Sequence, residues 1–142
     1  MKIRVAWVGK TKEPAIQALT DEYLKRTSRY AEIEGIAVKD EAAILALASG
    51  SRCKSILLDS RGKQYSSEEL AAMLEREQMN AVPLLFAIGG SDGFSEETRH
   101  AAGFVLSLGK MTLPHELARV VLVEQIYRAF TILAKHPYHV GH

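Results

Sequence analysis

The chain has 142 residues, of which 47% are hydrophobic and 25% charged, as in an ordinary globular domain. A net charge of +1 excludes binding to nucleic acid through a strong overall field, so any RNA contact must depend on a local patch. One cysteine, Cys53, excludes a disulfide framework, and no apolar segment is long enough to span a bilayer. We therefore expect one cytoplasmic domain over residues 1–142, with no membrane contact.

Strand-like and helix-like segments alternate along the chain. Ile3, Val5 and Trp7 alternate with polar residues as in a strand, and Ser66 with Glu69 forms a capping box before a helix. The predicted strands are 2–8, 33–38, 55–58, 84–88 and 104–108. Helices are predicted over 14–28, between Asp40 and Gly50, after Ser66, after Ser95 and over 114–135, with a loop at 59–65. This order favours an α/β fold, a parallel sheet with helices on both faces.

The glycine-rich loop after the fourth strand, GGSDGFS, is a candidate ligand site, because ligands of parallel sheets bind beyond the carboxyl ends of strands. Its spacing fits neither the dinucleotide fingerprint nor the phosphate loop. Asp92, Glu96 and Glu97 would also repel a phosphate from the following helix. The loop therefore suits a neutral or cationic ligand. The alternative is a plain strand-to-helix turn with a good cap.

The loop GKMTLPH, after the fifth strand, has an apolar middle, unlike most solvent loops. Met111 and Leu113 could pack on a flat ring while backbone amides bind its edge. The alternative is that both side chains fill the core beneath the loop.

The helix over 114–135 is apolar around most of its circumference, so both of its sides must be buried. A second copy of the chain is the simplest cover for the outer side, and a central core helix is the alternative. Arg119, Glu124 and Arg128 interrupt this surface, which argues against a membrane.

The tail HPYHVGH keeps an aromatic ring and three imidazoles. A metal site is not expected, because no acidic or cysteine ligand is near. Tyr138 could stack on a base and His139 could take a proton at neutral pH. The alternative is a frayed end.

Three segments together resemble the SPOUT-class methyltransferases of large-subunit ribosomal RNA: KIRVAWVGK, IGGSDGFS and LSLGKMTLPHELARVVLVEQIYRAFTILAKHPYH. The resemblance covers nearly the whole chain and is strongest for the enzymes that methylate N3 of a pseudouridine in 23S ribosomal RNA. It implies an α/β knot with a deep C-terminal trefoil, S-adenosyl-L-methionine as cofactor, a homodimer with a site built from both subunits, and assembled ribosomes as substrate.

The resemblance also implies roles for individual residues. His139 would be the general base or orient the base edge, and Tyr138 would position the uracil ring. Arg119, Arg128 and Lys63 would contact RNA, as would Arg61, although these charges could equally form ion pairs or remain solvated. The expected cofactor-binding residues are Leu58, Gly89, Gly90, Leu108, Gly109, Lys110, Met111, Thr112, Leu113 and Pro114.

Two features depart from the family pattern. Val140 stands where the family usually carries a basic residue after the tyrosine and histidine, and His142 could substitute in part. The segment between the second and third strands is also short. Two other functions compete with the ribosomal one: a non-catalytic adenosine- or nucleotide-binding module, and a SPOUT methyltransferase that acts on transfer RNA.

Overall fold

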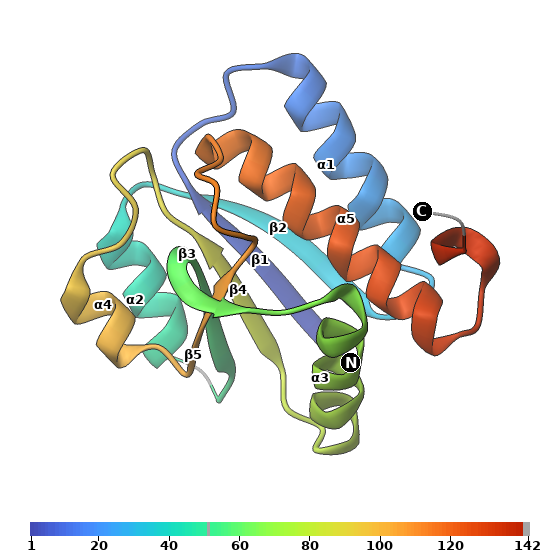
Figure 1. Cartoon of the computed structure of the whole chain (residues 1–142). Helices are drawn as coiled ribbons and strands as arrows, with labels where there is room; N and C mark the ends of the chain where they lie inside the picture. The colour runs from blue at the N-terminus through green and yellow to red at the C-terminus, as the bar shows by residue number, and fades with distance from the viewer. Residues whose placement is uncertain (51, 141–142) are drawn as a thin grey trace.

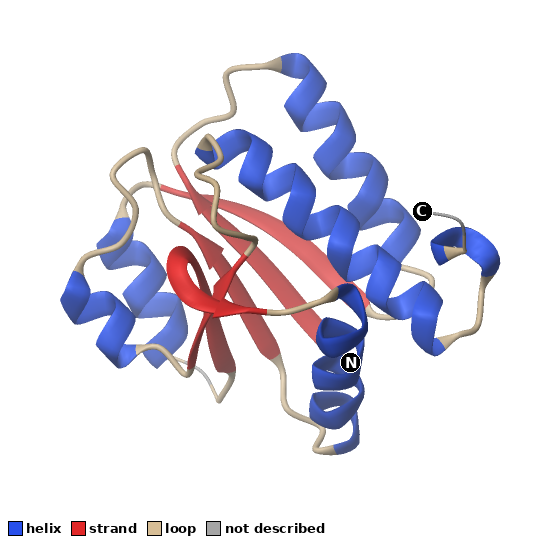
Figure 2. Ribbon diagram, viewed as in Figure 1, coloured by secondary structure: helices blue, strands red, loops and turns tan. Residues whose placement is uncertain are grey.

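The computed structural model describes residues 1–50 and 52–140, which form a five-stranded sheet between two layers of helices (Figures 1 and 2). All strand pairs are parallel, in the order β2-β1-β4-β3-β5. The strands are β1 (Lys2–Val8), β2 (Glu32–Val38), β3 (Lys54–Gln64), β4 (Leu84–Ile88) and β5 (Phe104–Ser107). The helices are α1 (Pro14–Thr27), α2 (Glu41–Ser49), α3 (Ser67–Met79), α4 (Glu96–Ala101), α5 (His115–Leu133) and the short 3₁₀ helix η1 (Pro137–His139). The predicted parallel sheet with helices on both faces is confirmed.

Side chains that alternate along the central strands pack into two separate hydrophobic cores, one on each face of the sheet. Val5 and Phe86 point into the larger core with α3 and α5, whereas Ala6 and Leu85 point into the smaller core with Ile44 of α2. In Figure 1, α1, α3 and α5 lie on one face of the sheet, and α2 and α4 lie on the other. The strand period of two residues sends neighbouring side chains to opposite faces, which explains this division.

Local capping signals predicted several helix starts. Ser66 and Glu69 form the expected reciprocal capping box, and the Asp40 carboxylate accepts a hydrogen bond from the Ala43 N–H. Pro114 is the N-cap of α5, so this helix begins one residue later than predicted. Such caps satisfy backbone N–H groups that have no partner in the first turn, which is why they mark helix starts so clearly.

The prediction of a loop at 59–65 was wrong. Strand β3 continues to Gln64, because the chain returns to β5 after an interruption: Leu106 pairs with Leu58 and again with Lys63. At Gly62 the two segments approach so closely that a Cβ atom would lie 2.6 Å from the Val105 carbonyl oxygen. A non-local pairing of this kind leaves no periodic pattern in the sequence.

This extension of β3 also bears on the expected knot. In the view of Figure 1, the segment from β5 to α5 passes behind the extension of β3. A chain that returns beneath such a crossing is what a trefoil requires, although most folds avoid it. The knot itself stays a prediction from the resemblance.

Candidate active site

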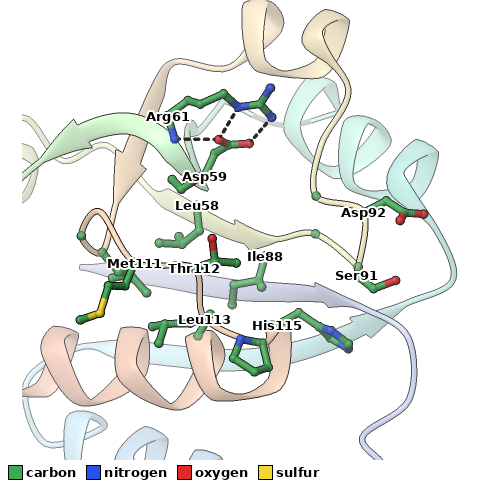
Figure 3. A pocket seen from close by; sticks show the side chains of 18 residues that line it. Leu58, Asp59, Arg61, Ile88, Ser91, Asp92, Met111, Thr112, Leu113 and His115 are labelled. Carbon is green, nitrogen blue, oxygen red and sulfur yellow. Dashed lines mark hydrogen bonds and ion pairs between the residues drawn. The ribbon is translucent and has the colours of Figure 1, made fainter.

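A cavity of about 660 Å³ lies beyond the carboxyl ends of β4 and β5 and beside residues 58–61, in the middle of β3 (Figure 3). These three strands are neighbours in the sheet, so the loops after β4 and β5 and the interrupted part of β3 after Leu58 meet at one edge. The volume is in the range of roughly 300–1,000 Å³ that is usual for small-molecule sites. The two candidate loops, GGSDGFS and GKMTLPH, and the first part of the β3 extension therefore surround one cavity.

The cavity wall contains all the expected cofactor-binding residues except Lys110. Their role in binding stays a prediction, but the structure brings them together from three separate segments. The wall also includes Asp59, Ile88 and His115, which sequence reasoning did not select. Asp59 and Ile88 could have been found because each stands at the end of a buried apolar strand segment, which is where parallel sheets place ligands.

The glycine loop turns back on itself beside the cavity. Gly93 has φ +71°, a left-handed conformation that glycine adopts without strain, and its N–H donates to the Gly90 carbonyl. Ser95 then caps α4 by accepting the Thr98 N–H. The loop is thus a tight turn with a good cap, and it is also the cavity wall, so the two readings of its sequence are not exclusive.

The loop before α5 presents apolar side chains to the outside. Met111 is 84% exposed and Leu113 is 38% exposed, so neither fills the core, and the core-filling alternative was wrong. The Ser107 hydroxyl accepts the Gly109 N–H and donates to the Gly109 carbonyl, which fixes the start of this loop. Apolar side chains held at the mouth of a cavity are available to a ligand or a second chain.

An internal ion pair neutralises the arginine of the cavity wall. Arg61 donates through its backbone N–H, Nε and a terminal nitrogen to the Asp59 carboxylate, each at 2.9 Å (Figure 3). The Arg61 hydrogen bond is the main reason that the pKa of the nearly buried Asp59 carboxyl lies below its usual value. With Arg61 engaged and Asp92 also on the wall, the cavity has no free guanidinium to receive a phosphate.

The expected catalytic residues lie at the other end of α5. This helix has 19 residues and so spans about 28 Å, with the cavity at its start and Tyr138 and His139 beyond its end. Tyr138 is folded back on α5: its hydroxyl donates to the Glu124 carboxylate at 2.8 Å, and its ring meets the Tyr127 ring edge-on. Burial is the main cause that raises the pKa of the Tyr138 hydroxyl, which keeps it protonated as a donor. A single subunit does not bring cavity and tail together.

The family model described as "Predicted SPOUT methyltransferase" matches residues 1–139. The chain belongs to this family.

Two relatives that match this SPOUT chain over nearly its full length share one name. A Koribacter versatilis protein called "Ribosomal RNA large subunit methyltransferase H" is 57% identical, with 100% of both chains covered. A Geobacter sulfurreducens protein of the same name is 46% identical, with 98% of this chain and 99% of the relative covered.

Solved structures show the same fold at low sequence identity. A Neisseria gonorrhoeae putative methylase family protein matches with a TM-score of 0.58 and 13% identity, covering 95% of this chain and 94% of that one. A Legionella pneumophila putative methyltransferase, solved in complex with the bound cofactor SAM, matches with a TM-score of 0.52 and 16% identity, covering 91% and 66%.

The basic residues expected to contact RNA differ in their surroundings within the SPOUT domain. Arg119 is only 1% exposed: its guanidinium stacks 4.1 Å from the Trp7 ring centroid and donates to the Thr11 hydroxyl. The direct RNA contact expected of it is therefore not open to this side chain. Arg128 pairs with Glu124 at 2.9 Å, which is the ion-pair alternative, and Lys63 lies exposed beside the Tyr65 ring.

Within residues 1–50 and 52–140, no group of three His, Cys, Asp or Glu side chains could hold a metal ion. His142, the suggested substitute for a basic tail residue, lies outside the described part of the SPOUT domain. Across the same described residues, no helix is both long and apolar enough to cross a membrane.

Proposed function

We propose that this chain is an S-adenosyl-L-methionine-dependent methyltransferase that modifies N3 of a pseudouridine in 23S ribosomal RNA on assembled ribosomes of the cytoplasm. The observation that carries the proposal is the 57% identity, over the full length of both chains, to a protein named for large-subunit ribosomal RNA methylation. Because both chains are covered to 100%, the loops that surround the cavity and the tail both lie within the matched span.

The cavity has the chemistry that this cofactor needs. S-adenosylmethionine supplies, when bound, a methyl group activated by a positively charged sulfur. Leu58, Ile88 and Leu113 offer an apolar wall for a flat ring, and the exposed backbone of the glycine loop offers amide and carbonyl groups for its edge. Asp92 on the same wall favours a cation over an anion. The Legionella pneumophila structural relative, solved with this cofactor, supports the same assignment.

A homodimer is the second part of the proposal, because the tail cannot reach the cavity of its own subunit. Apolar side chains of α5 and of the loop before it are uncovered: Leu117 is 47% exposed on α5, and Met111 and Leu113 are exposed in the loop. Antiparallel packing of two such surfaces would place the tail of one subunit at the cavity of the other. The second copy of the chain that the sequence predicts against the outer side of α5 would then also complete the active site.

The tail residues have groups suited to the proposed roles. The Nδ1 atom of His139 is buried without a hydrogen-bond partner among the described residues, so no hydrogen bond within the subunit commits this nitrogen. We assign His139 the removal of the N3 proton and Tyr138 the orientation of the uracil ring. The rest of the rate enhancement would come from holding the base in line with the methyl group and in contact with it.

Tritiated methyl transfer to 70S ribosomes, free subunits and transfer RNA tests the proposed substrate. We expect label in the 23S ribosomal RNA of 70S particles, released as N3-methylpseudouridine after digestion. Label in transfer RNA alone would contradict the ribosomal assignment and favour the transfer RNA alternative.

Calorimetry tests the cofactor independently. We expect S-adenosylmethionine to bind and ATP to bind far more weakly, because Arg61 is already occupied by Asp59. Tight binding of ATP without binding of S-adenosylmethionine would instead support the non-catalytic nucleotide-binding module.

A further inference from the structure

A second cavity, of about 370 Å³, lies at the C-terminal end of α1. We call it the α1 basic cavity. Its lining residues are Glu22, Lys25, Arg26, Ser28, Arg29 and Tyr127. Three positive side chains therefore face one carboxylate, on a protein whose whole formal charge is only +1. Positive charge is thus concentrated here, as recognition by a local patch requires.

Two of the three cations are available to a ligand. Arg26 is committed, since it donates to Glu22 at 2.7 Å and lies over the rings of Tyr23 and Tyr127. Lys25 and Arg29 are both exposed, and neither has an ion pair with another described residue. The Ser28 hydroxyl donates to the Lys25 carbonyl, so it keeps acceptor capacity only.

The α1 basic cavity adjoins the proposed catalytic tail. Tyr127 lines the cavity, and its ring centroid lies 4.7 Å from that of Tyr138. The Arg128 guanidinium is 5.2 Å from the same Tyr138 ring, on the next position of α5. One aromatic ring therefore separates the cavity from the residue that is proposed to orient the target base. If Tyr138 holds the target base, this cavity is the adjoining site for a neighbouring phosphate of the RNA chain.

Stabilisation of α1 explains only part of this cluster. Cations in the last turn of a helix interact favourably with its dipole, which accounts for Lys25 and Arg26. Arg29 lies beyond the end of α1 at Thr27, and Tyr127 comes from another helix. Stabilisation of the helix end therefore does not explain Arg29, nor the cavity that Arg29 forms with Tyr127.

We infer that the α1 basic cavity binds the phosphodiester backbone of the substrate RNA next to the target nucleotide, through Lys25 and Arg29. The inference rests on the proposed function, because it takes the tail as the place where the base is held. Arg26 and Tyr127, which contact each other, form the wall of the cavity between the two free cations and the tail. Backbone contacts of this kind set affinity and register, and base contacts at the tail set specificity.

The double variant Lys25→Gln/Arg29→Gln tests this inference, with binding to 70S ribosomes measured by co-sedimentation at several KCl concentrations. We expect affinity to fall about tenfold, and the slope of log K against log salt to shrink by roughly 1.4, because two single-strand phosphate contacts are lost. Calorimetric binding of S-adenosylmethionine should be unchanged. In methyl transfer, KM for ribosomes should rise while kcat stays within about twofold.

The matched control is Lys39→Gln/Arg52→Gln, which also removes one lysine and one arginine but flanks α2 on the opposite face of the sheet. Equal loss of ribosome binding in both double variants would show a general charge effect and overturn the inference. So would an unchanged salt slope in the first variant. Dissociation of its dimer, measured by sedimentation velocity, would instead make the cavity a subunit contact and would also overturn it.

This design separates the inference from the proposed function. Ribosome binding is measured without catalysis, so a wild-type protein that binds ribosomes but methylates only another RNA would contradict the proposed function. The binding data would still decide whether Lys25 and Arg29 contact RNA phosphates.

Discussion

Arg119 is a buried cation without a carboxylate partner among the described residues. Its side chain is almost fully buried, and its guanidinium lies on Trp7 and donates to Thr11. Burial lowers the pKa of Arg119, yet arginine remains protonated at neutral pH. Its Nε is buried without a hydrogen-bond partner, so part of the cost of burying the charge is not offset. The bulk of this residue should therefore contribute more to stability than its charge.

Two substitutions separate the bulk of Arg119 from its charge. We expect Arg119→Ala to lower the free energy of unfolding by about 3 kcal/mol, because it leaves a cavity. Arg119→Met keeps the stem and should cost less than about 1 kcal/mol. Urea unfolding followed by the fluorescence of Trp7, the only tryptophan, measures both. Equal losses would show that the guanidinium contacts carry the stability instead.

His139 is predicted to act in the chemical step alone. His139→Ala should bind S-adenosylmethionine normally and slow single-turnover methyl transfer by about 10²- to 10⁴-fold, as expected for loss of a general base. His100→Ala, a change at an exposed imidazole that lies 3.6 Å from the Glu96 carboxylate, is the control and should have no effect. A wild-type rate for His139→Ala would remove the proposed role.

At the scale of elements, one carboxylate joins the two helices behind the glycine loop. Glu41, in the first turn of α2, accepts hydrogen bonds from the backbone N–H and hydroxyl of Ser95 and from the hydroxyl of Thr98. The Thr98 bond is the main cause that lowers the pKa of Glu41 from its ordinary value of 4.5. Because Ser95 ends the loop that lines the cavity, Glu41 anchors that loop from outside the site.

Glu41→Gln should therefore destabilise the protein in a pH-dependent way. The lowered pKa means that the carboxylate stabilises the fold fully above pH 4.5, and that this contribution is lost as the pH falls through the folded-state pKa. At pH 7 we expect a loss of about 1 kcal/mol, or about 3 °C in Tm, after allowance for partial exposure.

Thermal unfolding of both proteins between pH 3 and pH 7 measures the difference, which should shrink toward the acid end. Glu34→Gln, at an exposed position of β2, is the control and should show no such trend. A constant difference at all pH values would mean that the charge of Glu41 is not what holds the loop.

At the scale of the whole molecule, the active site is proposed to be shared between two subunits. Gly89→Val would disable the cavity, since a Cβ atom added there would lie 3.0 Å from the Gly93 backbone, and His139→Ala would disable the tail. Each homodimer should be inactive. Mixed dimers, formed by co-refolding, should recover about one quarter of wild-type activity, because half of the dimers have one intact shared site. No recovery would show that each tail serves its own subunit, or that the protein acts as a monomer.

Much of the architecture follows from local patterns in the sequence. Alternation at Ile3, Val5 and Trp7, the capping box at Ser66 and the strand-ending glycines at Gly89 and Gly90 are local, because backbone geometry imposes their periods and caps within a few residues. The edge of the sheet that holds the cavity could be predicted for the same reason, since parallel strands end together.

The tertiary structure alone decided three matters, each of which depends on contacts between distant residues. The extension of β3 is a strand because it pairs with β5. No hydrophobic periodicity within residues 59–65 indicates this pairing. Arg119 is buried against Trp7 and Thr11, which are more than 100 positions away in the sequence. The sequence alone therefore suggests an exposed cation that could contact RNA. The separation of Tyr138 from the cavity depends on the length and direction of α5 across the sheet, which only the packed molecule defines.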